Sequence, residues 1–181
     1  MTSAEEFTEF AAAASPRLRR TAFLLCGDWQ AAEDLTQATL AKVFVAWRRI
    51  SRRDAALAYA THTMANTYLA GQRRRRVAEL LTDRPPDRPA EPGTPELRIM
   101  VLDALAALSP KARAVVVLRY WEDLSVEQVA DLLGCSPGNV KSQSTRSLAK
   151  LRALLGGAVA ASDPRAPVPG KRPETGDQHH G

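Results

Sequence analysis

Residues 125–152, SVEQVADLLGCSPGNVKSQSTRSLAKLR, constrain the fold of this chain most strongly, because they carry the signals of two helices joined by a tight turn. Ser125 and Gln128 have the spacing of a capping box, which predicts that a helix begins at Ser125. Gly134 follows the last apolar position, where a left-handed residue commonly ends a helix. Ser136, followed by proline, then marks the start of a second helix. The stretch therefore predicts a helix-turn-helix.

The second of these helices separates its residue types by face. At 100° per residue, Val140 and the leucines gather on one side, and small or polar residues gather on the other. Residues 137–156 include four basic residues and no acidic residue. An ordinary amphipathic helix with a solvated basic face has the same pattern. The pattern also suits insertion into the major groove of DNA, and the residues that we then predict to contact DNA are Gly138, Asn139, Lys141, Ser142, Thr145, Arg146 and Lys150.

The composition narrows the classes of partner and site. The 181-residue chain has a formal net charge of +5, which favours a polyanionic partner. It has no run of 18 apolar residues and no secretory signal, so we expect no membrane insertion and a cytoplasmic location. Cys26 and Cys135 are too few for a disulfide framework or a zinc site. Because no nucleophile is paired with a base either, we predict no catalytic residue, no metal and no cofactor.

Prolines divide the chain into two folded parts. Residues 83–95 include five prolines in thirteen residues, which is typical of an extended linker. Strand signals are almost absent, so we predict an all-α fold of two small helical domains. The boundaries that follow are a first domain at residues 1–80, a flexible linker at 81–95, a second domain at 96–156 and a disordered tail at 157–181.

The first domain has the pattern of a three-helix bundle. Its first helix carries an apolar stripe from Phe7 to Leu25 and is expected to end at Gly27, and Asp28 can cap the second helix. The third helix is expected at about residues 54–76, and it closes with four consecutive arginines. A helix C-terminus favours cations, but consecutive helical positions point all round the axis, so some of these arginines must face outward. Contact with a nucleic-acid backbone is the explanation that we prefer.

The second domain is predicted to contain four helices. Thr94 and Ser109 are each followed by proline, which marks the starts of two helices that precede the helix-turn-helix and support it. The linker leaves open whether the two domains are separate or packed together.

Three segments together resemble a known family. Residues 108–152, LSPKARAVVVLRYWEDLSVEQVADLLGCSPGNVKSQSTRSLAKLR, resemble the C-terminal domain of bacterial sigma factors of the sigma-70 superfamily, which reads the −35 promoter element. Residues 31–47, AAEDLTQATLAKVFVAW, are similar to the helix with which the N-terminal sigma domain grips the clamp helices of RNA polymerase. Residues 58–76, AYATHTMANTYLAGQRRRR, are similar to the helix that reads the −10 element. With two domains, the chain resembles the extracytoplasmic-function (ECF) sigma factors, the smallest class.

The resemblance implies a sigma factor that directs core RNA polymerase to promoters and initiates transcription at −35 and −10 elements. Core RNA polymerase and promoter DNA are the implied partners, and many relatives are also held inactive by an anti-sigma factor. The second helix of the helix-turn-helix, with the seven predicted DNA contacts given above, would be the recognition helix that reads the −35 element. The other implied contacts are Asp34, Leu35 and Gln37 with polymerase, Asn66, Arg73, Arg74, Arg75 and Arg76 with the −10 region, and Ser125 and Gln128 with phosphate.

Two departures from the family pattern qualify the resemblance. Ala38 stands where many members have an acidic residue. The resemblance therefore does not fix how strongly this chain binds polymerase. Thr61 and His62 stand where basic residues are expected, which predicts weaker backbone contact or a different −10 preference. Two other functions stay open from the residues alone: a stand-alone helix-turn-helix transcriptional regulator that dimerises, and a helical adaptor that binds only protein.

Overall fold

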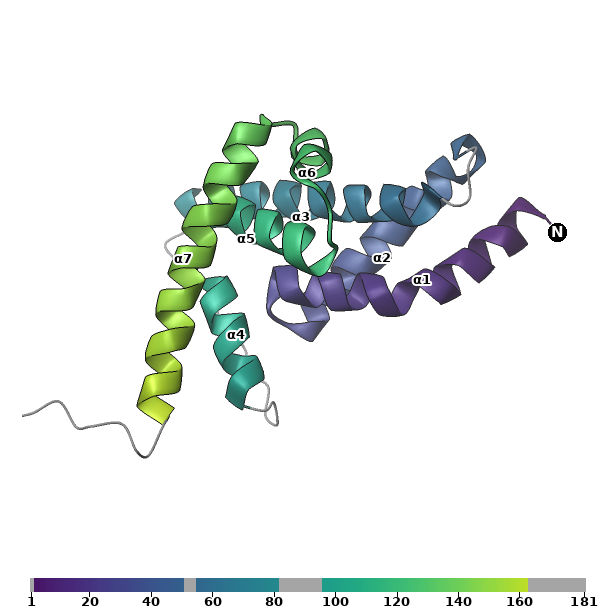
Figure 1. Ribbon diagram of the computed structural model, residues 1–181. Helices are drawn as coiled ribbons and strands as arrows, with labels where there is room; N and C mark the ends of the chain where they lie inside the picture. Colours follow the sequence, from purple (N-terminus) through teal and green to yellow (C-terminus); the bar gives the residue numbers. More distant parts are fainter. Residues whose placement is uncertain (1, 51–54, 82–95, 163–181) are drawn as a thin grey trace, which may run out of the picture.

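The structure, a computed structural model, describes residues 2–50, 55–81 and 96–162. All regular secondary structure in these ranges is helical, as predicted (Figure 1). Residues 82–95 of the predicted linker, which include the predicted N-cap Thr94, and residues 163–181 of the predicted tail lie outside the described residues, so these parts stay predictions. The elements are α1 (Ser3–Cys26), α2 (Trp29–Ala46), the 3-10 turn η1 (Trp47–Arg49), α3 (Ala56–Leu81), α4 (Glu96–Ala106), α5 (Pro110–Val116), the π-helical turn η3 (Val117–Trp121), α6 (Val126–Leu133) and α7 (Pro137–Ser162).

Helices α1 to α3 form the predicted three-helix bundle. Gly27 ends α1 with a φ of 81°, a left-handed conformation that glycine adopts at no steric cost. Asp28 then caps α2 by accepting hydrogen bonds from the N–H groups of Gln30 and Ala31. The sharp turn brings α2 back along α1, and α3 packs against both. The side chains buried between these helices include Leu18, Leu25, Val43, Trp47 and Met64, each at most 2% exposed.

Helices α4 to α7 are the four helices predicted for the second half. Ser109 caps α5, and Ser125 and Gln128 form the predicted capping box at the start of α6. Gly134 ends α6 with a φ of 60°, and Ser136 caps α7 by accepting a hydrogen bond from a backbone N–H. The helix-turn-helix is thus confirmed together with each of its local signals.

Several details differ from the predictions. α7 continues to Ser162, so the helix does not end near residue 156, where the tail was predicted to begin. A glycine costs only about 1 kcal/mol inside a helix, and the alanine-rich residues that follow Gly157 are strong helix formers. α3 likewise continues past residue 76 to Leu81. The π-helical turn η3 was not predicted, and the aromatic ring of Tyr59 on α3 is exposed.

The two halves pack together and share their cores. Ala114 and Val117, from α5 and η3, are buried among the side chains of α1 to α3. In the opposite direction, Ala65 of α3 is buried among the side chains of α5, η3, α6 and α7. Figure 1 shows α5 and α6 lying against the first bundle. The question that the linker left open is therefore answered: the domains form one packed body.

Arg113 joins the two halves through hydrogen bonds that the sequence did not predict. Arg113 is only 8% exposed. Its guanidinium donates to the carbonyl oxygens of Leu105 (2.8 Å) and Ala106 (3.0 Å) at the end of α4. It also donates to the carbonyl oxygen of Leu25 at the end of α1, at 2.8 Å. The carbonyl oxygen of Leu105 also accepts from the Leu108 N–H at 3.1 Å. Those of Leu25 and Ala106 lie in the last turns of their helices, where no intrahelical donor reaches them, so the guanidinium satisfies groups that would otherwise be buried without a hydrogen bond.

Gly134 gives a stability prediction of opposite sign to that of a neighbouring glycine. Gly134→Ala is expected to lower the free energy of unfolding by about 1–2 kcal/mol, because alanine is strained at positive φ although a Cβ there would meet no atom within 4 Å. Gly138→Ala, inside α7, where a Cβ would make only an ordinary contact with the Ser136 Oγ at 4.0 Å, should instead stabilise by about 0.5–1 kcal/mol. Urea unfolding of both variants checks the pair. Equal effects would contradict the left-handed turn.

Candidate nucleic-acid interface

The polar face of α7 is exposed while the opposite face is buried. Val140 and Leu151 pack in the core, and the small side chains of Ser144 and Ser147 are also buried. Arg146 lies along the exposed face, where its guanidinium donates to the Oγ of Ser142 at 3.0 Å and to the carbonyl oxygen of that residue at 3.3 Å. The predicted contacts that are exposed on this helix are Gly138, Lys141, Ser142, Thr145, Arg146 and Lys150, while Asn139 is half-buried.

Lys150 has a structural partner in addition to its predicted role. Its Nζ donates to the carbonyl oxygen of Ala107 at 2.7 Å, just after the C-terminal end of α4. The ammonium group therefore compensates the negative end of the α4 dipole and holds α4 against α7. The ammonium has three N–H donors, so two of them remain for a phosphate.

Ser125 and Gln128 bond to each other's backbone. The Ser125 Oγ accepts from the Gln128 N–H at 3.0 Å, and the Gln128 Oε1 accepts from the Ser125 N–H at 2.7 Å. The cap leaves the two amide N–H groups of the Gln128 side chain available as donors. Gln128 is exposed and Ser125 is half-buried at the start of α6, where the predicted phosphate contact would lie.

One exposed face of α3 carries Tyr59, His62 and Asn66 at helical spacing. The Asn66 Nδ2 lies 3.2 Å from the His62 Nε2, so these two side chains are paired on that face. Arg73, Arg74, Arg75 and Arg76 are all exposed further along the helix, as predicted for at least some of them. Arg73 and Arg74 also border a shallow depression with Val77 and Ala78.

Thr61 lies on the adjacent face of α3, and its burial explains one departure from the family pattern. The residue is 6% exposed and lines a pocket of about 550 Å³ between α3 and α6. A lysine or arginine at this position would place its charge against α6, where desolvation is unfavourable. The packing of the two halves is thus compatible with the small hydroxyl side chain at this position.

The predicted polymerase contacts on α2 divide into exposed and buried side chains. Asp34 and Gln37 are exposed, and each is bonded to a residue one turn earlier on the same helix. Leu35 is 8% exposed and packs in the core, so its side chain holds α2 in the bundle and does not face a partner. No sequence signal pointed to Val45, which is 82% exposed and follows Asp34 by three helical turns on the same face.

Other chemistry-bearing side chains do not gather into a further site within the described ranges. Among these residues, no three histidine, cysteine or acidic side chains are close enough to hold a metal ion together. Burial, helped by the nearby carboxylate of Asp28, raises the pKa of the Cys26 thiol to about 12, so this thiol is a poor nucleophile at neutral pH. No helix in the described part of the chain is long and apolar enough to span a membrane.

Comparison with known proteins identifies both halves. Residues 10–77 match the family model of sigma-70 region 2, and residues 98–151 match that of sigma-70 region 4. The RNA polymerase sigma-E factor of Streptomyces coelicolor is 39% identical over 152 residues, which cover 83% of this chain and 86% of that protein. The ECF RNA polymerase sigma factor SigL of Mycobacterium tuberculosis is 30% identical, covering 76% of this chain and 82% of SigL. The chain belongs to the ECF sigma factors.

The sigma factor therefore directs core RNA polymerase to promoter DNA, as the resemblance implied. Region 2 spans α1 to α3, and region 4 spans α4 to α7. A co-crystal structure of the sigma factor RpoE with the anti-sigma factor NepR from Bartonella quintana has a TM-score of 0.69 and 26% identity, covering 84% of this chain and 98% of that one. CnrH in complex with the cytosolic domain of CnrY has the same fold, with a TM-score of 0.59 and 22% identity over 86% and 95% of the two chains.

Proposed function

We propose that the sigma factor reads the −35 element with the exposed face of α7. The observation that carries this proposal is the separation of faces on α7, where the buried side packs on α5 and α6 and the exposed side holds small, polar and basic residues. An α-helix fits the major groove, where arginine can bond two acceptors of a guanine. Arg146 and Lys141 are both exposed on this face, and in this proposal Arg146 would read a base while Lys141 would contact phosphate. Ser125 and Gln128 would approach the backbone from the start of α6.

The −10 element is assigned to α3. Tyr59 offers an exposed aromatic ring, and Asn66 offers donors and acceptors on the same face, which are the groups that bind unpaired bases by stacking and hydrogen bonding. Arg73 to Arg76 would contact the backbone nearby. Binding the unpaired state favours strand separation without any bond chemistry, so the role is that of an initiation factor and not of an enzyme.

Polymerase binding is assigned to the exposed face of α2 that holds Asp34, Gln37 and Val45. An exposed apolar residue next to polar ones is a common composition for a protein interface. Because its partner acts on the bacterial chromosome, the sigma factor would work in the cytoplasm. A similar sigma factor has been solved with an anti-sigma factor, and this supports an anti-sigma partner for the present chain as well.

Charge reversal at Asp34 tests the polymerase surface. Asp34→Lys is expected to weaken binding to core polymerase about tenfold, because it places a cation where the surface now presents an exposed carboxylate. Binding of the same variant to a −35 duplex should not change. The control is Glu9→Lys, which reverses an equally exposed charge on α1. If both variants bind polymerase as the wild type does, the assigned surface is wrong.

Reconstitution tests the function as a whole. Purified core polymerase should initiate at a matching promoter only when the sigma factor is added. A stand-alone regulator would behave differently, because it would dimerise and bind its site tightly without polymerase. Sedimentation of the free protein and transcription from the same preparation therefore separate the two functions.

A further inference from the structure

Regions 2 and 4 meet around one buried carboxylate. Glu122, which is 7% exposed, follows η3, and its carboxylate accepts hydrogen bonds from the guanidinium of Arg17 at 2.8 and 3.2 Å. The hydroxyl of Thr21 donates to the other carboxylate oxygen. The indole N–H of Trp121 donates to the Thr21 Oγ1 at 3.2 Å. These groups link α1 of region 2 to the end of η3 in region 4.

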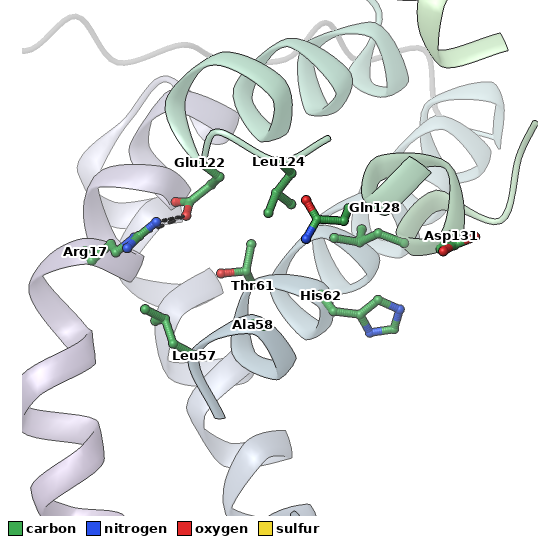
Figure 2. A pocket seen from close by; sticks show the side chains of 10 residues that line it. Arg17, Leu57, Ala58, Thr61, His62, Glu122, Leu124, Gln128 and Asp131 are labelled. Atoms are coloured by element: carbon green, nitrogen blue, oxygen red, sulfur yellow. Dashed lines mark hydrogen bonds and ion pairs between the residues drawn. The ribbon is translucent and has the colours of Figure 1, made fainter. Parts of the chain in front are cut away.

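The contact covers one flank of the helix assigned to the −10 element. Ala58, Thr61 and Ala65 share this flank of α3, and Thr61 and Ala65 are buried. Figure 2 shows Thr61 and His62 across the pocket from Gln128 of α6, with the Arg17–Glu122 pair at the pocket's other end. The −10 helix and the first helix of the helix-turn-helix therefore face each other directly.

This closed arrangement cannot engage both promoter elements. The −35 and −10 elements lie roughly 25 base pairs apart, which is roughly 85 Å along the duplex at the rise of B-DNA. In the closed form α3 packs against α6, so the two DNA-reading parts are in contact instead of separated by that span. The halves must part before both elements are bound.

We propose that Glu122, held by Arg17 and Thr21, is a latch that keeps the free sigma factor closed until core polymerase separates regions 2 and 4. The inference rests on the proposed function for the roles of α3 and α7, while closure itself concerns the free chain. Because only open chains can engage polymerase with both regions, the apparent affinity is reduced by the fraction of chains that are open. Weakening the latch therefore strengthens polymerase binding.

The test uses the full chain and a reporter that it already contains. The Trp121 indole N–H gives one of three tryptophan side-chain NMR signals, and Trp121→Phe identifies it. Arg17→Ala and Glu122→Ala should each move this signal away from its wild-type position. Both variants should also bind core polymerase about three- to tenfold more tightly. This is the range expected when the chain loses a partly exposed ion pair that holds the closed form against opening. The charge-swapped double variant, Arg17→Glu with Glu122→Arg, should restore both values toward the wild type.

Arg19→Ala is the matched control. Arg19 and Arg17 have side chains about equally exposed, at 51% and 52%, but Arg19 pairs with Glu33 within region 2, so its loss should leave both readouts unchanged. The latch is overturned if Arg17→Ala leaves the Trp121 signal and polymerase affinity unchanged, or if it weakens polymerase binding. Should Glu122→Ala fail to fold, Arg17→Ala decides alone, because that side chain is half exposed. Wild-type protein that never binds polymerase refutes the proposed function, while the Trp121 signal still tests the latch.

Discussion

Replacing Arg113 by leucine is expected to lower the free energy of unfolding by about 2–5 kcal/mol. The reason is that leucine fills much of the space but cannot donate to the carbonyl oxygens of Leu25 and Ala106, while that of Leu105 keeps its bond from the Leu108 N–H. Each buried acceptor left without a partner costs about 1–3 kcal/mol, and the effects at one site are not fully additive. Urea unfolding followed by circular dichroism measures the loss.

Lys111→Leu is the control for this substitution. Lys111 lies two residues earlier in α5, and its side chain is exposed, so removing its charge should change the stability by no more than about 0.5 kcal/mol. A loss for Arg113→Leu as small as that of the control would mean that water replaces the guanidinium at these carbonyls. The role of Arg113 in joining α1, α4 and α5 would then be wrong.

Arg146→Ala is expected to reduce affinity for the −35 element by about 1–3 kcal/mol, which is roughly 5- to 150-fold. Arg146 is exposed on the polar face of α7. Its side chain can leave Ser142 and turn to a base, because the hydrogen bond that it would lose is exposed to water. Because arginine bonds to specific base edges, the variant should also lose its preference at one position of the element. Binding to duplexes with each base substituted in turn measures both effects.

Arg152→Ala provides the comparison on the same helix. Arg152 is exposed, but it lies roughly 9 Å further along the axis, away from the helix start that enters the groove. Its loss should weaken binding by a smaller and uniform amount for all sequences, with a lower dependence on salt, as expected for a phosphate contact. Equal and uniform losses for both arginines would show that Arg146 contacts only the backbone.

Local signals were the part of the fold that the sequence predicted well. Gly27, Asp28, Ser125 and Gly134 act within one helical turn of their own positions, and each has the predicted conformation or capping bond. Such signals depend on backbone geometry and neighbouring residues alone, so no knowledge of the tertiary packing was needed.

Contacts between regions 2 and 4 could not be predicted in this way. Ala65 of region 2 is buried among side chains of region 4, and Val117 of region 4 is buried among side chains of region 2. Both contacts depend on which two surfaces meet, and the periodicity of a single helix does not indicate this. Glu122 and Arg113 are charged residues that a pattern assigns to the surface, yet both are buried because their partners come from distant segments.

Leu35 illustrates the limit of carrying a family motif over to single residues. Its spacing from Thr39 and Val43 is that of an apolar stripe on α2, while the family motif implies a polymerase contact. Burial in the core favours the first assignment. The neighbouring Asp34 and Gln37 are exposed, so the motif and the structure agree there on which side chains are available to a partner.

Transcription from a promoter library with purified core polymerase tests the central claim most directly. The library carries randomised −35 and −10 regions, and sequencing of the transcripts identifies the templates that were used. The two-region assignment predicts enrichment of both elements, with Arg146→Ala altering only the upstream one. Tight binding of DNA without transcripts, or a change of the downstream element on mutation of Arg146, would contradict it.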